Sequence, residues 1–161
     1  MATDFFLELD GIKGESADHK HKDQLDIASF SWGVTNSGAS AGGGGGGAGK
    51  ASFQDLHFTT EVGTASPTLM LACATGQHIK KAVLHVRKAG GDQQNYYTVT
   101  LSDVLISSYQ SGAHSSGDPI PTDQFSLNFA KIEFEYKPQK ADGSLGSAVK
   151  TGYDLKANKK V

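Results

Sequence analysis

The sequence predicts a mainly β fold: a bent β-barrel with one short flanking α-helix, in a single domain over residues 1–161. Three observations support this. Apolar side chains alternate along most ordered runs, as in strands with one buried face. The alternation changes parity inside three long runs, which indicates bulged and bent strands. Helix signals are confined to one stretch. Long bent strands favour a closed or nearly closed barrel over a flat sheet.

The first strands are expected in FFLEL and QLDIASFSWGV, separated by a turn at DGIKGES. In the second run the apolar residues move from odd to even positions: Leu25 and Ile27, then Phe30, Trp32 and Val34. Ser29, Ser31 and Gly33 would then point away from the core. Three interpretations of this strip of small residues stay open: ordinary exposed serines, a surface that another surface approaches closely, or a smooth, weakly interacting wall.

A glycine-rich segment follows, and we expect a mobile loop over about 36–52. Gly44, Gly49 and Lys50 satisfy all but the last place of the phosphate-binding pattern G-x-x-x-x-G-K-[ST]. The last place is Ala51, which has no hydroxyl for a magnesium ion. The next run, SFQDLHFTTEV, has a strand pattern where a phosphate-binding loop needs a helix. The glycines are therefore interpreted as a loop between strands.

The single helix is expected in ASPTLMLACATGQ. Ser66 suits the N-cap, Pro67 the first helical position and Gly76 the left-handed residue after the last turn. Leu69, Ala72 and Cys73 recur at helical spacing and would pack on the barrel.

Three further strands complete the predicted barrel. In HIKKAVLHVRKAGG the apolar residues face inward, and an outer basic face would pair with acidic groups on a neighbouring strand or subunit; that face comprises Lys81, His85 and Arg87. The runs YYTVTLSDVLI and FSLNFAKIEFEYK both change parity. In the first the change is from Tyr97, Val99 and Leu101 to Val104 and Ile106, and in the second from Phe125, Leu127 and Phe129 to Ile132, Phe134 and Tyr136.

Composition and charge argue against binding to nucleic acid or membranes. A net charge of −2 and a pI near 6.3 give no broad electrostatic case for nucleic acid or an anionic membrane. The longest apolar run, LMLACA, is too short to insert across a membrane. The N-terminus has no basic region, and Asp4 and Glu8 interrupt its apolar run. We therefore expect a protein made in the cytoplasm that leaves the cell, if at all, without a cleaved signal peptide.

No enzyme, metal or cofactor site is expected. His19 and His21 sit in a charged segment that is expected to be a solvated loop. Cys73 lies mid-helix among apolar residues, where an inert thiol is the default. Glu133 and Glu135 alternate with lysines on one strand face, as ordinary surface charges do.

Five blocks occur in an order that closely resembles the haemolysin-coregulated protein (Hcp) family, the tube subunit of bacterial type VI secretion. They are GESADHKHKDQLDIASFSWGV, the glycine-rich loop leading into GKASFQDLHFTT, SPTLMLACATGQH, LHVRKAGG and SLNFAKIEFEYKPQKADGS. The resemblance covers nearly the whole chain and implies a bent two-sheet β-barrel with one short flanking α-helix.

The resemblance implies a secreted homohexameric ring. Rings would stack into a hollow tube inside a contractile sheath, beneath a VgrG-type spike, and carry effector proteins without catalysis. Ser31 matches the family position that faces the lumen, with Ser29 on the same small-residue strip. The glycines of the loop would reach a neighbouring subunit or ring; they are Gly42, Gly43, Gly44, Gly45, Gly46 and Gly47.

A different hypothesis also remains, a monomeric β-barrel that binds a small ligand. It requires an open interior, and the aromatic residues of the strands favour a filled one.

Overall fold

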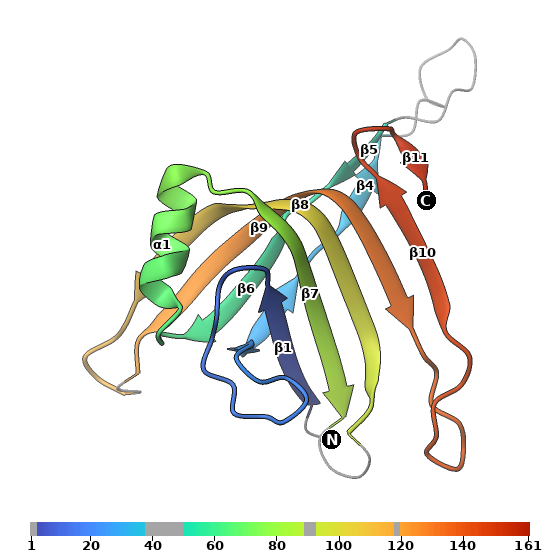
Figure 1. Ribbon diagram of the computed structural model, residues 1–161, viewed down its shortest axis with the longest axis horizontal. Coiled ribbons are helices and arrows are strands. Elements are labelled where there is room, and N and C mark those ends of the chain that lie inside the picture. Colours follow the sequence, from blue (N-terminus) through green and yellow to red (C-terminus); the bar gives the residue numbers. More distant parts are fainter. Residues whose placement is uncertain (1–2, 38–49, 89–92, 118–119) are drawn as a thin grey trace.

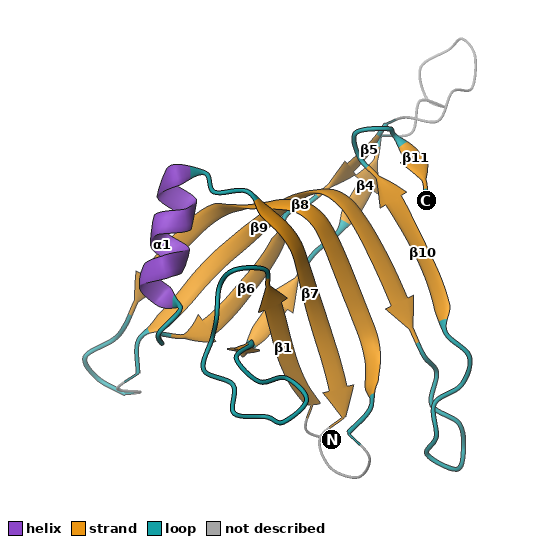
Figure 2. Ribbon diagram, in the orientation of Figure 1, coloured by secondary structure: helices purple, strands orange, loops and turns teal. Residues whose placement is uncertain are grey.

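The computed structural model describes residues 3–37, 50–88, 93–117 and 120–161 (Figure 1). Strands dominate the described residues and one helix flanks them (Figure 2), which confirms the mainly β class. The elements in chain order are β1 (Thr3–Leu9), β2 (Leu25–Ile27), β3 (Ser29–Ser31), β4 (Val34–Asn36), β5 (Ala51–Phe53), β6 (Leu56–Glu61), α1 (Ser66–Thr75), β7 (Ile79–Lys88), β8 (Asn95–Gly112), β9 (Thr122–Tyr136), β10 (Val149–Asp154) and β11 (Lys159–Lys160).

Most of the described strands belong to one antiparallel sheet that curves over the core. Its order is β11-β10-β9-β8-β7-β1-β2, and β6 pairs with β9 while β3 pairs with β6. The first part of β9, 122–127, pairs with β6, and its last part, 131–136, pairs with β10. Because β9 has different neighbours at its two ends, the sheet turns over on itself (Figure 1).

The sequence predicts a closed or nearly closed barrel, and a closed one is wrong, because the strand pairing of the described residues does not close. β2 pairs with β1, whereas β3 pairs with β6. The change of partner occurs at Ala28, whose N–H donates to the carbonyl oxygen of Thr59. The sheet therefore wraps the core as an open, strongly bent layer, with β4 and β5 paired as a separate ribbon.

The parity changes predicted in β8 and β9 occur, and they occur opposite each other. Buried residues change from Leu101 to Val104 in β8 and from Phe129 to Ile132 in β9. Leu101 pairs with Ile132 and Val104 with Phe129, so the register is the same on both sides of the change. A bulge in one strand would shift the register by one residue. Here both strands change face together at Asp103, whose φ is 53°.

The parity change in the 25–34 run is only partly confirmed. Leu25 and Ile27 are buried, while Phe30 and Trp32 are half-buried and pack against the core. Val34 is 51% exposed, so the prediction that it enters the core is wrong. The reason is that β4 leaves the main sheet to pair with β5.

The helix forms where the sequence predicts, but it begins at Ser66, one residue before the expected first helical residue, Pro67. Ala65 occupies the N-cap position without a side-chain cap, and Gly76 ends the helix with φ 66° and ψ 36°. Ser66 is buried; its hydroxyl donates to the carboxylate of Asp123 on β9 and accepts from the N–H of Gly63. The serine therefore ties the helix to the sheet rather than capping it.

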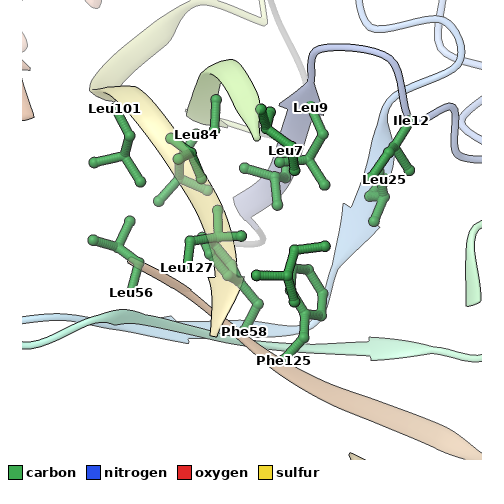
Figure 3. Packing of buried hydrophobic residues seen from close by; sticks show 14 of the residues in the cluster. Leu7, Leu9, Ile12, Leu25, Leu56, Phe58, Leu84, Leu101, Phe125 and Leu127 are labelled. Carbon is green, nitrogen blue, oxygen red and sulfur yellow. The ribbon is translucent and has the colours of Figure 1, made fainter. Parts of the chain in front are cut away.

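The interior is filled with large apolar side chains (Figure 3). Phe58 and Phe125 stack with ring centroids 5.2 Å apart, and both are at most 2% exposed. Leu56 and Leu127, which pair across β6 and β9, are fully buried. Packing of this kind leaves the small-ligand hypothesis without the open interior that it requires.

Two further predictions, both about residues in or beneath the segment between β1 and β2, are wrong. The sequence predicts a solvated loop around His21 and an outward-facing Arg87, yet they are 4% and 3% exposed. This segment folds back over β1 and β7, where His21 stacks on Phe6 and Asp18 pairs with Arg87. Arg87 also pairs with Asp4 on β1, so the predicted pairing with a neighbouring strand is confirmed.

Candidate functional site

The two predicted lumen serines lie at an edge of the sheet. Ser29 and Ser31 are exposed on β3, and Phe30 between them turns toward the core, where its ring meets Phe5 edge to face at 5.1 Å. Alternation along an extended strand thus places both hydroxyls on the same outer face. The structure therefore brings the two predicted residues together on one surface.

The strand register extends this surface across four strands, because paired residues point to the same face of a sheet. One row runs Ser31, His57, Ser126, Ser108, and the next runs Ser29, Thr59, Gln124, Gln110. We call these eight residues the polar sheet face. Seven of the eight have a neutral polar side chain, and the eighth, His57, is a histidine.

Hydrogen bonds hold one corner of the polar sheet face in place. The hydroxyl of Ser126 lies 2.7 Å from that of Ser107 and 2.5 Å from that of Ser108. Ser107 also donates to Asp55 at 2.6 Å, and the amide of Asn128 donates to the other oxygen of Asp55 at 3.0 Å. Both oxygens of the Asp55 carboxylate, at the border of the polar sheet face, thus accept hydrogen bonds from uncharged side chains.

Sequence reasoning identified two of the eight residues. The alternation of the β6 run already puts His57 and Thr59 on the face opposite Phe58, so a signal for them exists. Which strands lie beside β3 depends on long-range pairing, and periodicity within one run carries no information on it. Gln110, Gln124 and the serines of β8 and β9 could not be assigned for that reason.

The other predicted site falls on residues that the structure does not describe. The six glycines Gly42, Gly43, Gly44, Gly45, Gly46 and Gly47 lie within 38–49, outside the described ranges. Both sides of that segment are described, and they form the β4–β5 ribbon, in which Asn36 pairs with Ala51. The predicted loop of about 36–52 therefore includes strand residues at both ends.

A cleft of about 350 Å³ lies next to the start of α1. Its lining includes four acidic residues, Glu15, Asp26, Glu61 and Asp123. Burial raises the pKa of Asp26, and the neighbouring carboxylates of Asp4, Asp18 and Glu61 raise it further. Within the described ranges no three His, Cys, Asp or Glu residues are grouped to hold a metal ion. The same residues contain no helix long and apolar enough to span a membrane.

Comparison with known proteins adds to this geometry. The family model described as "Type VI secretion system effector, Hcp" matches residues 6–136. The chain is 44% identical over 160 residues to Protein hcp1 of Pseudomonas aeruginosa, covering 98% of each.

Solved structures share the fold. One described as a type six secretion system protein has a TM-score of 0.93 at 30% identity, with 99% of this chain and 100% of that one covered. Hcp1 from Salmonella typhimurium has a TM-score of 0.80 at 32% identity, with the same coverage. Since the family match spans most of the chain and the similarity nearly all of it, this chain belongs to the Hcp family of type VI secretion proteins.

Proposed function

We propose that this chain is a structural tube subunit of a type VI secretion system, in which six copies form a ring and rings stack into a hollow tube. Proteins of the Hcp family are type VI secretion components that form rings and tubes. The observation that carries the proposal for this chain is the polar sheet face, two rows of polar side chains without fixed carboxylates or ammonium groups across four strands, all but Ser126 at least partly exposed. It suits the wall of a lumen.

The chemistry of that face supports a role in transport. Serine, threonine and glutamine side chains offer hydrogen bonds that water can replace at little cost. A surface without fixed charges or large apolar groups binds varied proteins weakly and releases them. We therefore assign Ser29 and Ser31, with their row neighbours His57 and Thr59, to the surface that holds effector proteins during transit.

The proposed partners follow from a tube. A contractile sheath would surround it, a VgrG-type spike would sit at its end, and effector proteins would travel inside. The protein would be made in the bacterial cytoplasm, leave through the type VI machine and act without catalytic turnover. The glycines Gly42 to Gly47 would contact a neighbouring subunit or ring, where the lack of a Cβ permits close backbone approach.

The test is the mass of the purified full-length chain by light scattering after size exclusion, with negative-stain images of the same fraction. The proposal expects about six times the 16.9 kDa chain mass and annular particles. A protein that stays monomeric across micromolar concentrations would contradict the proposed hexameric ring. The alternative, a monomeric barrel that binds a small ligand, is disfavoured by the filled interior.

A further inference from the structure

The segment 13–24, here called the 13–24 loop, lies between β1 and β2 in the chain (Figure 1). Its His21 is buried together with Phe6 on β1 and Arg87 on β7, which form a second cluster of buried side chains. The ring of His21 stacks on that of Phe6 with centroids 4.4 Å apart and planes 8° from parallel. The guanidinium of Arg87 lies 4.8 Å from the centre of the same Phe6 ring and binds both carboxylate oxygens of Asp18. The loop is thus attached at two points, an aromatic one and an ionic one.

At the aromatic point two imidazoles are in contact, with their planes tilted by 48°. The rings of His21 and His85 have centroids 4.9 Å apart. His21 Nδ1 donates to Gln24 Oε1 at 2.9 Å, which fixes one nitrogen of that ring. On His85, Nε2 lies 3.7 Å from Glu8 Oε2, while Nδ1 is buried and has no hydrogen-bond partner.

This geometry accommodates neutral histidines and penalises charged ones. A neutral His85 keeps its proton on Nε2, toward Glu8, and leaves only a lone pair on the buried Nδ1. Protonation would put an N–H at Nδ1 with no acceptor, which costs the desolvation of that donor. A second positive ring at His21 would add repulsion between like charges at close range.

We propose that the 13–24 loop is an acid-responsive latch: protonation of His85, whose ring contacts that of His21, detaches the loop from β1 and β7, while the Arg87–Asp18 ion pair keeps it tethered. The groups facing the pair are Glu8 on β1, which opposes the effect, and Lys81 on β7, which adds to it. Asp4 on β1 and Asp18 in the loop are engaged by Arg87.

The direction of the pH effect follows from His85. Burial lowers its pKa, His21 and Lys81 lower it further, and Glu8 offsets part of this. The closed loop therefore binds fewer protons than the open one. Its stability is fully present above the ordinary imidazole pKa of about 6.5 and is lost as the pH falls through the lower value of the closed state.

The tether responds in a different pH range. The hydrogen bonds from Arg87 hold the pKa of Asp18 far below its usual range, so this carboxylate stays charged where imidazoles titrate. The loop also supplies Gly14 and Glu15 to the cleft beside α1, and Glu15 Oε1 accepts from the N–H of Thr64 at 3.2 Å. Detachment would alter the wall of that cleft.

Hydrogen exchange followed by mass spectrometry on the full-length chain tests the latch, after correction for the intrinsic pH dependence of exchange. The reporter amides are those of Gly14, Ser16, Asp23 and Gln24, which are bonded within the loop. Between about pH 7.5 and about pH 5.5, wild-type protection should fall by about tenfold, as expected when opening takes up one proton.

Three variants locate the effect. His85→Gln removes the imidazole with the buried, unpartnered Nδ1 and should change less than about twofold over this range. His21→Phe keeps the stack on Phe6 and the burial of His85, so it should lose only part of the tenfold change. His78→Gln is the matched control, because His78 pairs with Asp103 at 3.0 Å on the exposed surface, and it should behave like the wild type. Protection that is independent of pH in the wild type, or that falls equally in His85→Gln, would overturn the latch.

Discussion

The indole Nε1 of Trp32 donates a hydrogen bond of 2.8 Å to the hydroxyl of Tyr97, joining residues 65 positions apart in the sequence. Trp32 follows β3 directly, and Tyr97 lies near the start of β8. Both rings also contact Phe134, Trp32 edge to face at 5.4 Å and Tyr97 at 4.7 Å. This cluster anchors the end of the short strand that carries Ser29 and Ser31.

Replacing Tyr97 with phenylalanine should therefore destabilise the protein modestly. The ring and its packing stay, but the half-buried indole N–H loses its acceptor, which costs about 1 kcal/mol in the free energy of unfolding. Urea unfolding followed by fluorescence measures this directly, because Trp32 is the only tryptophan in the chain. The matched control Tyr136→Phe changes an exposed tyrosine and should alter stability by less than about 0.5 kcal/mol. Equal effects of both variants would contradict a role for this bond.

Asp123 is the polar contact between α1 and the sheet, and its removal should cost more. The carboxylate is fully buried and accepts hydrogen bonds from Ser66 and, at 2.7 Å, from Tyr109. Burial raises the pKa of Tyr109, and its bond to Asp123 raises it further. Asp123→Ala leaves two hydroxyls without their acceptor and should lower the free energy of unfolding by about 2–3 kcal/mol.

The control for Asp123 is Asp142→Ala, which alters an exposed carboxylate that accepts hydrogen bonds from the N–H and the hydroxyl of Ser144. It should change stability by about 0.5 kcal/mol or less. Denaturant midpoints of the three proteins under one set of conditions make the comparison. An Asp123→Ala variant as stable as the control would show that water replaces the carboxylate.

The ion pair of Arg87 and Asp18 predicts a component of acid sensitivity. Arg87 holds the pKa of Asp18 below its usual range, so the ionised carboxylate favours the folded state. Its contribution is present above the ordinary aspartate pKa of about 3.9 and disappears as the pH falls toward the lower folded value. Thermal unfolding should show that, between about pH 6 and about pH 2, the Tm of the wild type falls more steeply with decreasing pH than the Tm of Asp18→Asn. Parallel curves would contradict this component.

Local features of the fold were predictable from the sequence, because they depend on neighbouring residues. Proline and glycine placed the helix within one residue of its bounds. Alternation located the faces of β8 and β9, including the change at Asp103. Alternation along the 25–34 run also predicted that Ser29 and Ser31 lie on the exposed side of β3.

Features that depend on contacts distant in sequence were missed. A segment rich in charged residues is predicted to be solvated when only its own sequence is considered. The burial of His21 on Phe6 depends on the position of β1 and therefore had no local signal. The change of partner at Ala28, which leaves the sheet open, depends on two pairings at once. The polar sheet face likewise required the register of β6, β8 and β9, whereas periodicity yields only one strand at a time.

The polar sheet face predicts that bulk at its first row impairs the holding of cargo without disturbing the fold. Ser31 is exposed, so Ser31→Gln should change stability by less than about 0.5 kcal/mol while its longer side chain covers neighbouring His57. Effector proteins that co-elute with wild-type rings on size exclusion should be reduced in the variant, with the ring mass unchanged. Ser147→Gln, which places the same side chain on an exposed residue before β10, is the matched control. Equal retention by intact rings of both variants would remove Ser31 from the cargo surface, whereas loss of the ring in Ser31→Gln alone would place this row at a subunit contact.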